Sequence, residues 1–209
     1  MIATKNKAAH VGSGEPVMGL TNHEQWRFEM ATSILPSIDV LQELLVCDAK
    51  NGKLYWKVRS RRWFKTDRSF NTWNSRFSGK EAFTATLQGY KVGSVNDVSL
   101  RAHRVIWALT YGLWPDNQID HIDGDRSNNR VENLREATSQ ENRINTGKRS
   151  DNNSGYKGVW WSKQKARWVS EIKKGGIRKH LGFFDCPSAA HEAYKAASEE
   201  LHGEFANHS

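Results

Sequence analysis

Four polar side chains within residues 119–145 have the types and the spacing of a hydrolytic site. Asp120 and His121 are adjacent, Asn133 follows His121 after twelve residues, and Asn142 comes nine residues later. A hard cation such as Mg²⁺ prefers oxygen ligands and keeps several waters, so Asp120 and Asn142 are the predicted metal ligands. A histidine is suited to act as a general base near neutral pH, and the side chain or carbonyl of Asn133 is predicted to hold the His121 ring. The set predicts metal-assisted hydrolysis of a phosphodiester.

Simpler interpretations of the same residues fit less well. The acidic run at residues 123–125 suggests a calcium-binding EF-hand loop, which requires Glu at its twelfth position. Counted from Asp120 that position is Val131, and counted from Asp123 it is Leu134, so the EF-hand is excluded. A lone His beside an Asp is usually a surface residue, but the full spacing favours the hydrolytic site.

Local signals distribute the four side chains over a strand, a loop, a second strand and a helix. Asp120 lies in a short apolar run, and a second apolar run over residues 131–137 indicates another strand. Thr138 and Ser139 are good helix N-caps, and Glu141, three residues after Thr138, completes a capping box. A small hairpin packed on such a helix would bring the four polar side chains around one point.

This motif resembles that of the HNH endonucleases, in particular the phage and intron-associated homing type, in which Asp-His opens the motif and two Asn follow at these distances. The resemblance implies a ββα-metal (His-Me finger) fold and metal-dependent DNA cleavage. It assigns Asp120 and Asn142 to the metal, His121 to the role of general base, and Asn133 to the orientation of its ring. Asn142 departs from members that carry a His there, and because an amide is a weaker ligand than an imidazole, this bears on metal preference.

The composition agrees with a folded, DNA-directed protein. The 209 residues carry a formal net charge of +8, which favours a polyanionic partner but does not by itself separate nucleic acid from an acidic membrane. Nine Trp and eight Phe supply material for real cores. The two cysteines are isolated, and no apolar run or signal peptide points to a membrane, so we expect a protein of the cytoplasm of a bacterium or phage-infected cell.

The nuclease domain is expected over residues 37–146, after a mobile N-terminal segment over residues 1–36. His103 opens an apolar segment outside the spacing of the motif, which favours a structural or DNA-contacting role over a catalytic one. The elements predicted before the motif are a weak helix over 22–35, a helix over 38–50 capped by Ser37, strands over 53–58, 82–87, 90–95 and 98–101, and a helix over 103–111.

Residues 59–80 combine seven basic residues and five aromatic residues with a single acidic one. Basic side chains meet phosphates, and interleaved aromatic rings can stack on bases or wedge between them. The alternative is a long loop whose aromatic rings fold back onto the nuclease core and leave the charges solvated. DNA-backbone contact is predicted for Arg61, Arg62 and Lys65.

A polar linker over residues 147–154 is expected to precede a second domain over residues 155–207, in which three strands form an antiparallel sheet packed on one alanine-rich helix. This unit resembles the plant ethylene-response-factor (ERF) type of DNA-binding domain, which also occurs attached to phage homing nucleases. The matching motifs are Tyr156-Lys157-Gly158-Val159, Trp168-Val169-Ser170-Glu171-Ile172, Leu181-Gly182-Phe183-Phe184 and the helix that ends in Leu201-x-Gly203.

In that family the sheet enters the major groove and reads base edges. Eight basic residues and one acidic residue between Lys157 and Lys179 give the sheet the charge for this role. A basic residue here is otherwise a solvated surface residue and a Trp a core residue, an alternative that applies to Trp168 in particular. DNA contact is predicted for Trp161, Lys163, Arg167, Trp168, Lys173 and Arg178.

Together these observations predict an α+β chain that is a site-directed DNA endonuclease of the homing type, leaving 5′-phosphate and 3′-hydroxyl ends. Double-stranded DNA is the expected partner and Mg²⁺ the expected cofactor, with Mn²⁺ as the alternative. One catalytic centre per chain predicts a nick, and a double-strand break would need a homodimer or a second visit by a monomer. The alternatives are a non-cutting, sequence-specific DNA-binding regulator on a relic HNH scaffold and, more weakly supported, an RNA-binding or structural module.

Overall fold

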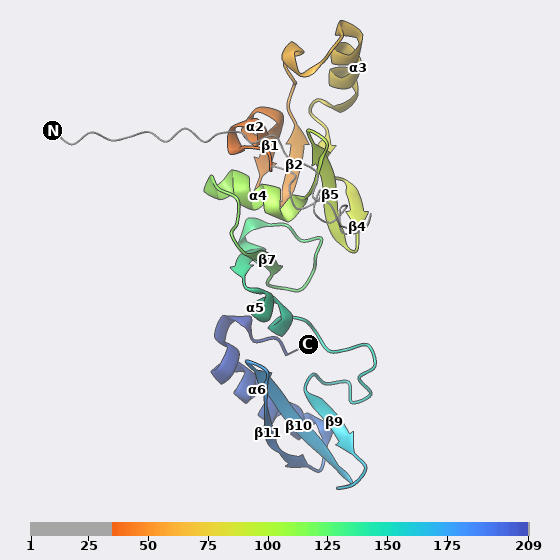
Figure 1. Ribbon diagram of the computed structural model, residues 1–209. Helices are drawn as coiled ribbons and strands as arrows, with labels where there is room; N and C mark the ends of the chain where they lie inside the picture. The colour runs from red at the N-terminus through yellow and green to blue at the C-terminus, as the bar shows by residue number, and fades with distance from the viewer. Residues whose placement is uncertain (1–34, 209) are drawn as a thin grey trace, which may run out of the picture. The chain divides into compact units, whose positions relative to one another are not determined.

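The computed structural model describes residues 35–208, so the predictions made for residues 1–34 lie outside the described residues. Pro36–Ser209 form one compact unit. Between residues 35 and 208 this unit contains helices and four small antiparallel sheets, which confirms the α+β class (Figure 1). No helix in this part of the chain has the length and apolarity that crossing a bilayer requires.

The unit begins with helix α2 (Ile38–Leu44) and a hairpin of strands β1 (Leu45–Asp48) and β2 (Lys53–Trp56). The predicted helix over 38–50 is therefore too long. Its continuation is replaced by β1 because the backbone turns back after Asp48, whose carboxylate accepts hydrogen bonds from the backbone and side chain of Asn51. The residues before this turn pair with those after it, as in a hairpin.

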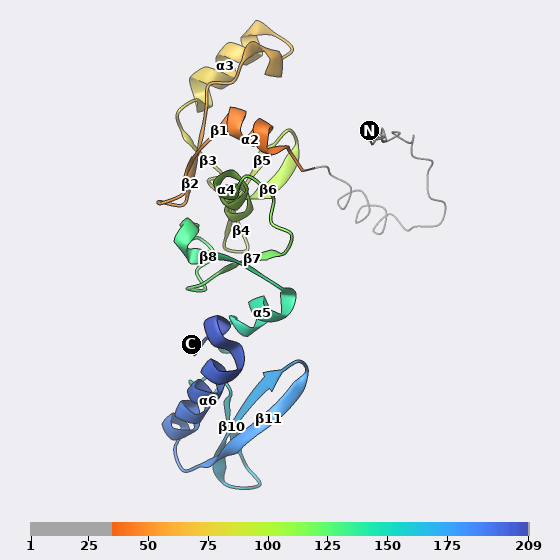
Figure 2. The same ribbon diagram turned by 90° about the vertical axis from the view of Figure 1, so that its left-hand side faces the viewer.

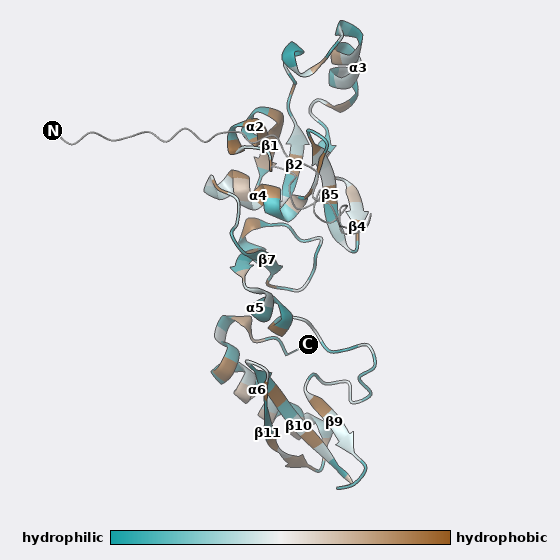
Figure 3. Cartoon of the chain, viewed as in Figure 1, coloured by the Kyte–Doolittle hydropathy of each residue, from teal (hydrophilic) through white to brown (hydrophobic). Residues whose placement is uncertain are grey.

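Residues 59–80, for which a long loop was the alternative to a DNA-contacting stretch, contain a 3₁₀ turn η1 (Arg61–Trp63) and helix α3 (Asp67–Phe77). Thr66 caps α3 through a reciprocal capping box with Ser69, a local signal that the sequence contained. Aromatic rings pack together on the inner face of α3, where the ring centroids of Trp73 and Phe77 are 5.3 Å apart. Most of the helix is hydrophilic (Figure 3). The aromatic rings of this segment thus pack together under a polar outer face.

The next strand predicted, over 82–87, is split into β3 (Glu81–Ala82) and β4 (Ala85–Leu87), which belong to different sheets. The break falls at Phe83, whose φ of 59° is incompatible with a strand. Phe83 is buried, and a Cβ on Gly93 would lie 2.8 Å from its ring, so Gly93 makes room for it. Strand β4 pairs with β5 (Tyr90–Val95), and β5 pairs with β6 (Val98–Arg101).

Helix α4 (Ala102–Tyr111) is the centre of the larger hydrophobic core. Its Val105, Ile106 and Ala108 are fully buried against residues of α2 and of strands β1, β2, β5 and β6. Gly112 ends the helix in the left-handed conformation, with a φ of 75°. The prediction of a buried helix over 103–111 is confirmed to within one residue.

The motif itself folds as strand β7 (Gln118–His121), strand β8 (Leu134–Ala137) and helix α5 (Ser139–Ile144). The two strands are antiparallel, with His121 opposite Leu134, and the first part of the predicted second strand is the 3₁₀ turn η2 (Val131–Asn133). Thr138 caps α5 with the predicted capping box. The sequence of strand, loop, strand and helix is therefore as expected.

The C-terminal part is a three-stranded antiparallel sheet in the order β11-β10-β9, covered by one helix (Figure 2). Its small core joins Ile172, Tyr194 and Ala197. Gly158 allows the close approach of helix and sheet, since a Cβ there would lie 2.1 Å from the Tyr194 ring. The elements are β9 (Val159–Ser162), β10 (Arg167–Lys174), β11 (Ile177–Phe184), α6 (Pro187–His202) and the 3₁₀ turn η3 (Gly203–Phe205).

Candidate active site

A polar pocket of about 300 Å³ lies where β7 meets α5. Asp120 and His121 reach it from the end of β7, and Asn142 reaches it from α5. Three of the four side chains predicted from the motif therefore line one cavity, although their residues are up to 22 positions apart in the sequence. Tyr90 and Asn145 also line this pocket.

The carboxylate of Asp120 is buried and held by two partners. Arg135, opposite it on β8, places Nε 3.0 Å and Nη2 2.9 Å from Asp120 Oδ2. Asn145 Nδ2 lies 3.0 Å from both carboxylate oxygens and donates a further hydrogen bond to the His121 carbonyl. Because a carboxylate away from water requires paired charge and hydrogen bonds, these partners satisfy the buried oxygens of Asp120 and fix their orientation.

The His121 ring is also buried, and it is held by Asn129. His121 Nε2 lies 3.0 Å from Asn129 Oδ1. A carboxamide oxygen can only accept a hydrogen bond, so Nε2 is the donor in this pair and Nδ1 is the ring nitrogen that remains to accept a proton. Among residues 35–208 no group forms a hydrogen bond with this Nδ1. The arrangement leaves one ring nitrogen able to take a proton.

Asn133, predicted to orient His121, lies elsewhere. Its carbonyl accepts from Ile122 N at 2.9 Å, and its side chain donates to Asp123 Oδ1 and to the Asn128 carbonyl. These bonds close the loop between β7 and β8 rather than contact the imidazole. The sequence offers little to separate Asn129 from Asn133, because both are amides in the same loop and only the turn before β8 decides which one faces the ring.

A second histidine packs on the first. The rings of His103 and His121 are perpendicular, with centroids 5.0 Å apart, and Tyr90 lies against both. His103 is 3% exposed and its Nδ1 has no hydrogen-bond partner in the described part of the chain. Burial, followed by the nearby His121, Arg101 and Arg104, lowers the pKa of His103 to about 3. His103 is therefore a neutral packing residue, which excludes the DNA-contacting alternative.

The oxygen donors at the pocket suit a hard divalent cation. Asn142 Nδ2 donates to Gln118 Oε1 at 2.7 Å, while its carboxamide oxygen has no hydrogen-bond partner within residues 35–208. Asp120 and Asn142 thus offer a carboxylate and an amide oxygen to one cavity. No group of three His, Cys, Asp or Glu residues able to hold a metal is found in the described chain. The donor set fits an ion that retains most of its waters, such as Mg²⁺, and does not fit a closed zinc site.

Comparison with known proteins agrees with this geometry. Residues 100–144, which include Asp120, His121, Asn133, Asn142 and also His103, match the family model described as HNH endonuclease. Over 107 residues the chain is 35% identical to Protein 3.8 of Escherichia phage T7, and this match covers 51% of this chain and 88% of that protein. Residues 100–144 of the chain belong to the HNH endonuclease family.

A second relative is the uncharacterized HNH endonuclease L560 of Acanthamoeba polyphaga mimivirus. It is 35% identical over 120 residues, which are 56% of this chain and 61% of that protein. No solved structure matches the chain significantly. The family assignment therefore rests on the sequence relatives and on the HNH motif.

Outside the HNH motif, the C-terminal sheet gathers most of the side chains predicted to contact DNA. The rings of Trp161 and Trp168 are paired across β9 and β10 with centroids 5.2 Å apart. Trp161 is 44% exposed, so it is a surface residue and not a core one. Five of the six predicted residues line one groove of about 780 Å³, namely Trp161, Lys163, Trp168, Lys173 and Arg178.

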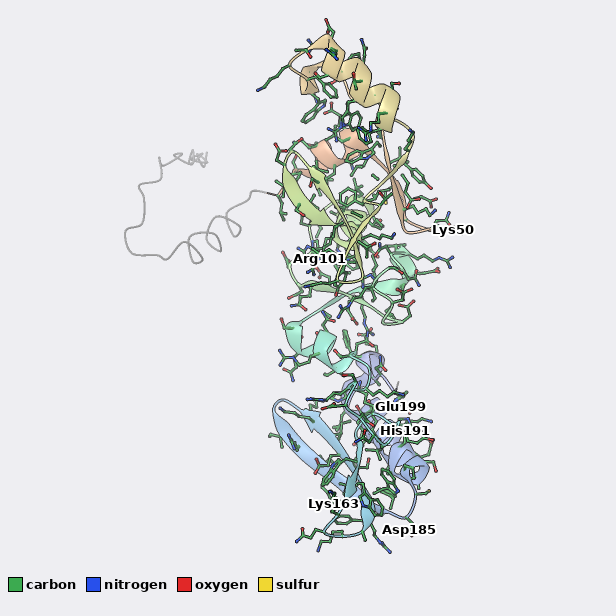
Figure 4. The ribbon with its side chains drawn as sticks, turned by 90° about the vertical axis from the view of Figure 1, so that its right-hand side faces the viewer. Lys50, Arg101, Lys163, Asp185, His191 and Glu199 are labelled. Carbon is green, nitrogen blue, oxygen red and sulfur yellow. The ribbon has the colours of Figure 1, made fainter. Side chains whose placement is uncertain are left out.

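Arg167, the sixth of these predictions, is not part of the groove. Its guanidinium lies 3.3 Å from Asp185, at the end of the sheet where Lys163 also lies (Figure 4). Both partners are exposed, so the pair contributes little to stability and leaves Arg167 accessible.

The basic residues predicted in the first half of the chain lie beside α3 and are partly engaged within the protein. Arg61 pairs with Asp67, and Arg62 pairs with Glu43. Lys65 is exposed. The sequence did not indicate the outer face of α3, which presents exposed basic and polar side chains: Arg68, Asn71, Thr72, Ser75 and Arg76. Asp67, at the start of the helix, is also exposed and pairs with Arg61.

Proposed function

We propose that this protein is a metal-dependent DNA endonuclease whose HNH motif hydrolyses a phosphodiester bond. The observation that carries the proposal is the convergence of Asp120, His121 and Asn142 on one pocket, with His121 held so that Nδ1 is free to accept a proton. A structural module has no physical need for a buried ion pair and an imidazole with an unbonded ring nitrogen facing the same polar cavity.

Asp120 and Asn142 are the residues that would hold the divalent ion, and the ion would neutralise charge on the phosphoryl oxygens. His121 Nδ1 takes a proton from a water molecule, and the oxygen of that water forms a bond to phosphorus. The bond from phosphorus to the 3′ oxygen breaks, and this oxygen takes a proton from solvent, which leaves a 5′-phosphate and a 3′-hydroxyl. Asn129 keeps the other ring nitrogen protonated throughout.

The C-terminal unit is proposed to hold and select the DNA site in the manner of an ERF-type domain. Its groove combines exposed Trp rings with Lys163, Lys173 and Arg178. A positively charged, three-stranded surface of this size can place side chains on base edges in the major groove while Lys and Arg contact phosphates. Arg167 remains a proposed phosphate contact because its carboxylate partner is exposed and replaceable.

A further DNA contact is proposed at α3. Its outer face offers Arg68 and Arg76 with three polar side chains between them, and Lys65 precedes the helix. Such side chains are typical of phosphate contacts, which fix the position of a protein on DNA without reading its sequence. Arg61 and Arg62 are proposed to contact phosphate by exchanging their carboxylate partners for the DNA backbone.

A homing role is the proposed biological setting, and one catalytic centre per chain makes a nick the proposed product of a monomer. The test is cleavage of supercoiled plasmid and phage DNA by the full chain with Mg²⁺ or Mn²⁺, with EDTA and His121→Ala as controls. We expect nicked product that both controls remove, with DNA affinity of His121→Ala unchanged. Salt-sensitive DNA binding without cleavage of any DNA, phage genomes included, would refute the nuclease and favour a non-cutting DNA-binding protein.

A further inference from the structure

The C-terminal end of the chain reaches the candidate active site. Asn207 Nδ2 donates to the Asn145 carbonyl at 2.7 Å and to Asn145 Oδ1 at 3.0 Å. Asn145 in turn donates to both oxygens of Asp120. A chain of hydrogen bonds therefore connects residue 207 to the carboxylate that would hold the metal, and residue 207 also lines the active-site pocket.

The same end of the chain also holds the second partner of Asp120. Arg135 donates from Nη1 to the Glu204 carbonyl, and its guanidinium carbon lies 3.9 Å above the Phe205 ring. Phe205 is buried. Arg135 therefore uses Nε and Nη2 for Asp120, Nη1 for the backbone of η3, and its flat face for an aromatic ring. A planar guanidinium fixed on every side has one orientation, and that orientation is the one that pairs with Asp120.

From these contacts we infer that Gly203–Asn207, which we name the C-terminal strap, is a positioning element of the nuclease site. The inference rests on the proposed function. Phe205 and Asn207 have no chemical step in the proposed reaction. They hold Arg135 and Asn145, and these two hold Asp120. Supporting residues of this kind typically change metal affinity or activity by about 10- to 100-fold when they are removed.

The strap also explains how the two parts of the chain cooperate. It follows α6, which covers the sheet with the proposed DNA-binding groove. Lys174, at the end of β10, donates to the Leu201 carbonyl just before the strap. A second attachment joins Lys157 Nζ to the Ile144 carbonyl at the end of α5, and burial lowers the pKa of Lys157 to about 8. The inference therefore predicts that the C-terminal unit contributes to catalysis as well as to the proposed DNA binding.

The test compares Asn207→Ala with His208→Ala in the full chain. His208 is the next residue and pairs with Glu199 of α6, so it controls for any change in the tail that leaves Asn145 untouched. We expect Asn207→Ala to lower kcat by about 10- to 100-fold, with KM for DNA and the melting temperature unchanged. His208→Ala should cleave like the wild type. In an Asn145→Ala background, Asn207→Ala should have no further effect on kcat, because Asn207 acts on Asp120 through Asn145.

A readout that does not depend on cleavage is hydrogen exchange at the Asn145 side-chain amide, assigned by NMR from its loss in Asn145→Ala. Exchange should be faster in Asn207→Ala than in His208→Ala. If the wild type cuts no DNA, the proposed function fails, and this exchange measurement still decides whether the strap holds Asn145. Phe205→Leu, which keeps the apolar packing and removes the ring under Arg135, serves if Asn207→Ala does not fold, and it should lower kcat in the same way. Wild-type kcat in the folded variants, or unchanged exchange at Asn145, would overturn the inference.

Discussion

The neutral, buried His103 makes a definite contribution to the pH dependence of stability. Its pKa is lowered from 6.5 to about 3 in the folded protein, chiefly by burial and further by His121, Arg101 and Arg104. In the unfolded chain it titrates at the ordinary value of about 6.5. Below pH 6.5 the unfolded state therefore binds a proton that the folded state does not, so stability falls as the pH falls toward 3.

The size of the effect follows from the two pKa values. Between pH 7 and pH 4.5 the titration of His103 lowers the free energy of unfolding by about 2.5 kcal/mol. The result is nearly the same if the folded pKa is about 4, because most of the interval lies above that value. For a domain of this size that is a shift in Tm of about 5–10 °C. His103→Leu has a similar volume and removes the buried, unpaired Nδ1, so it should lose this part of the pH dependence.

The assay is urea unfolding at 25 °C in EDTA, at pH 7 and pH 4.5, for the wild type and His103→Leu. Other titrating groups are common to both proteins, including His191 and His202, whose pKa values burial also lowers. Their contributions cancel in the difference between the two pH-dependent losses. Between pH 7 and pH 4.5 the free energy of unfolding should fall by about 2.5 kcal/mol more in the wild type than in the variant. Equal losses, within about 0.5 kcal/mol, would refute a neutral His103 in the folded state.

Two further predictions concern the proposed function. Asn129→Ala should lower kcat by about 10- to 100-fold and alter the pH–rate profile, because the tautomer of His121 is no longer fixed. Asn133→Ala should mainly lower the urea midpoint, because it opens the loop between β7 and β8. The reverse pattern would contradict the assignment of Asn129. The double variant Arg68→Ala with Arg76→Ala should weaken binding equally on all DNA sequences. It should reduce the slope of log Kobs against log salt by about 0.9 for each phosphate that it no longer neutralises, whereas the control Lys195→Ala on α6, where Lys195 pairs with Glu192, should leave the slope unchanged. An unchanged slope in the double variant would exclude α3 from the interface.

The parts of this fold that the sequence predicted are those fixed by local interactions. The capping box at Thr138, the apolar runs of β7 and β8 and the glycine after α4 act within a few residues, and each led to a correct element. The helix α3 was missed because its inner face consists of aromatic rings in a strongly basic stretch, which resembles a DNA-contacting loop. The Thr66 cap was the signal that would have identified it.

The site was predicted only as far as its residues lie on regular elements. Asp120, His121 and Asn142 follow from strand and helix positions, and they meet at the pocket. The partners that hold them come from elsewhere. Asn129 is selected by the path of an irregular loop, and Phe205 and Asn207 come from the far end of the chain, with a separation of 62 residues between Asn145 and Asn207. No local pattern connects such positions.

The use of amides around a single buried carboxylate has a physical reason. Asn145 must accept a hydrogen bond from Asn207 and donate to Asp120 at the same time, which a carboxamide can do and a carboxylate cannot. An acidic residue at this position would place two carboxylates about 3 Å apart in a buried site, where one of them would be forced to take up a proton. With a neutral amide, Arg135 balances Asp120, and the donors run from Asn207 through Asn145 to the carboxylate, so each of these bonds strengthens the next. In the proposed nuclease, the position of Asp120 therefore depends on contacts from Gly203–Asn207, so a site built on β7 and α5 also draws on residues that follow the C-terminal sheet in the sequence.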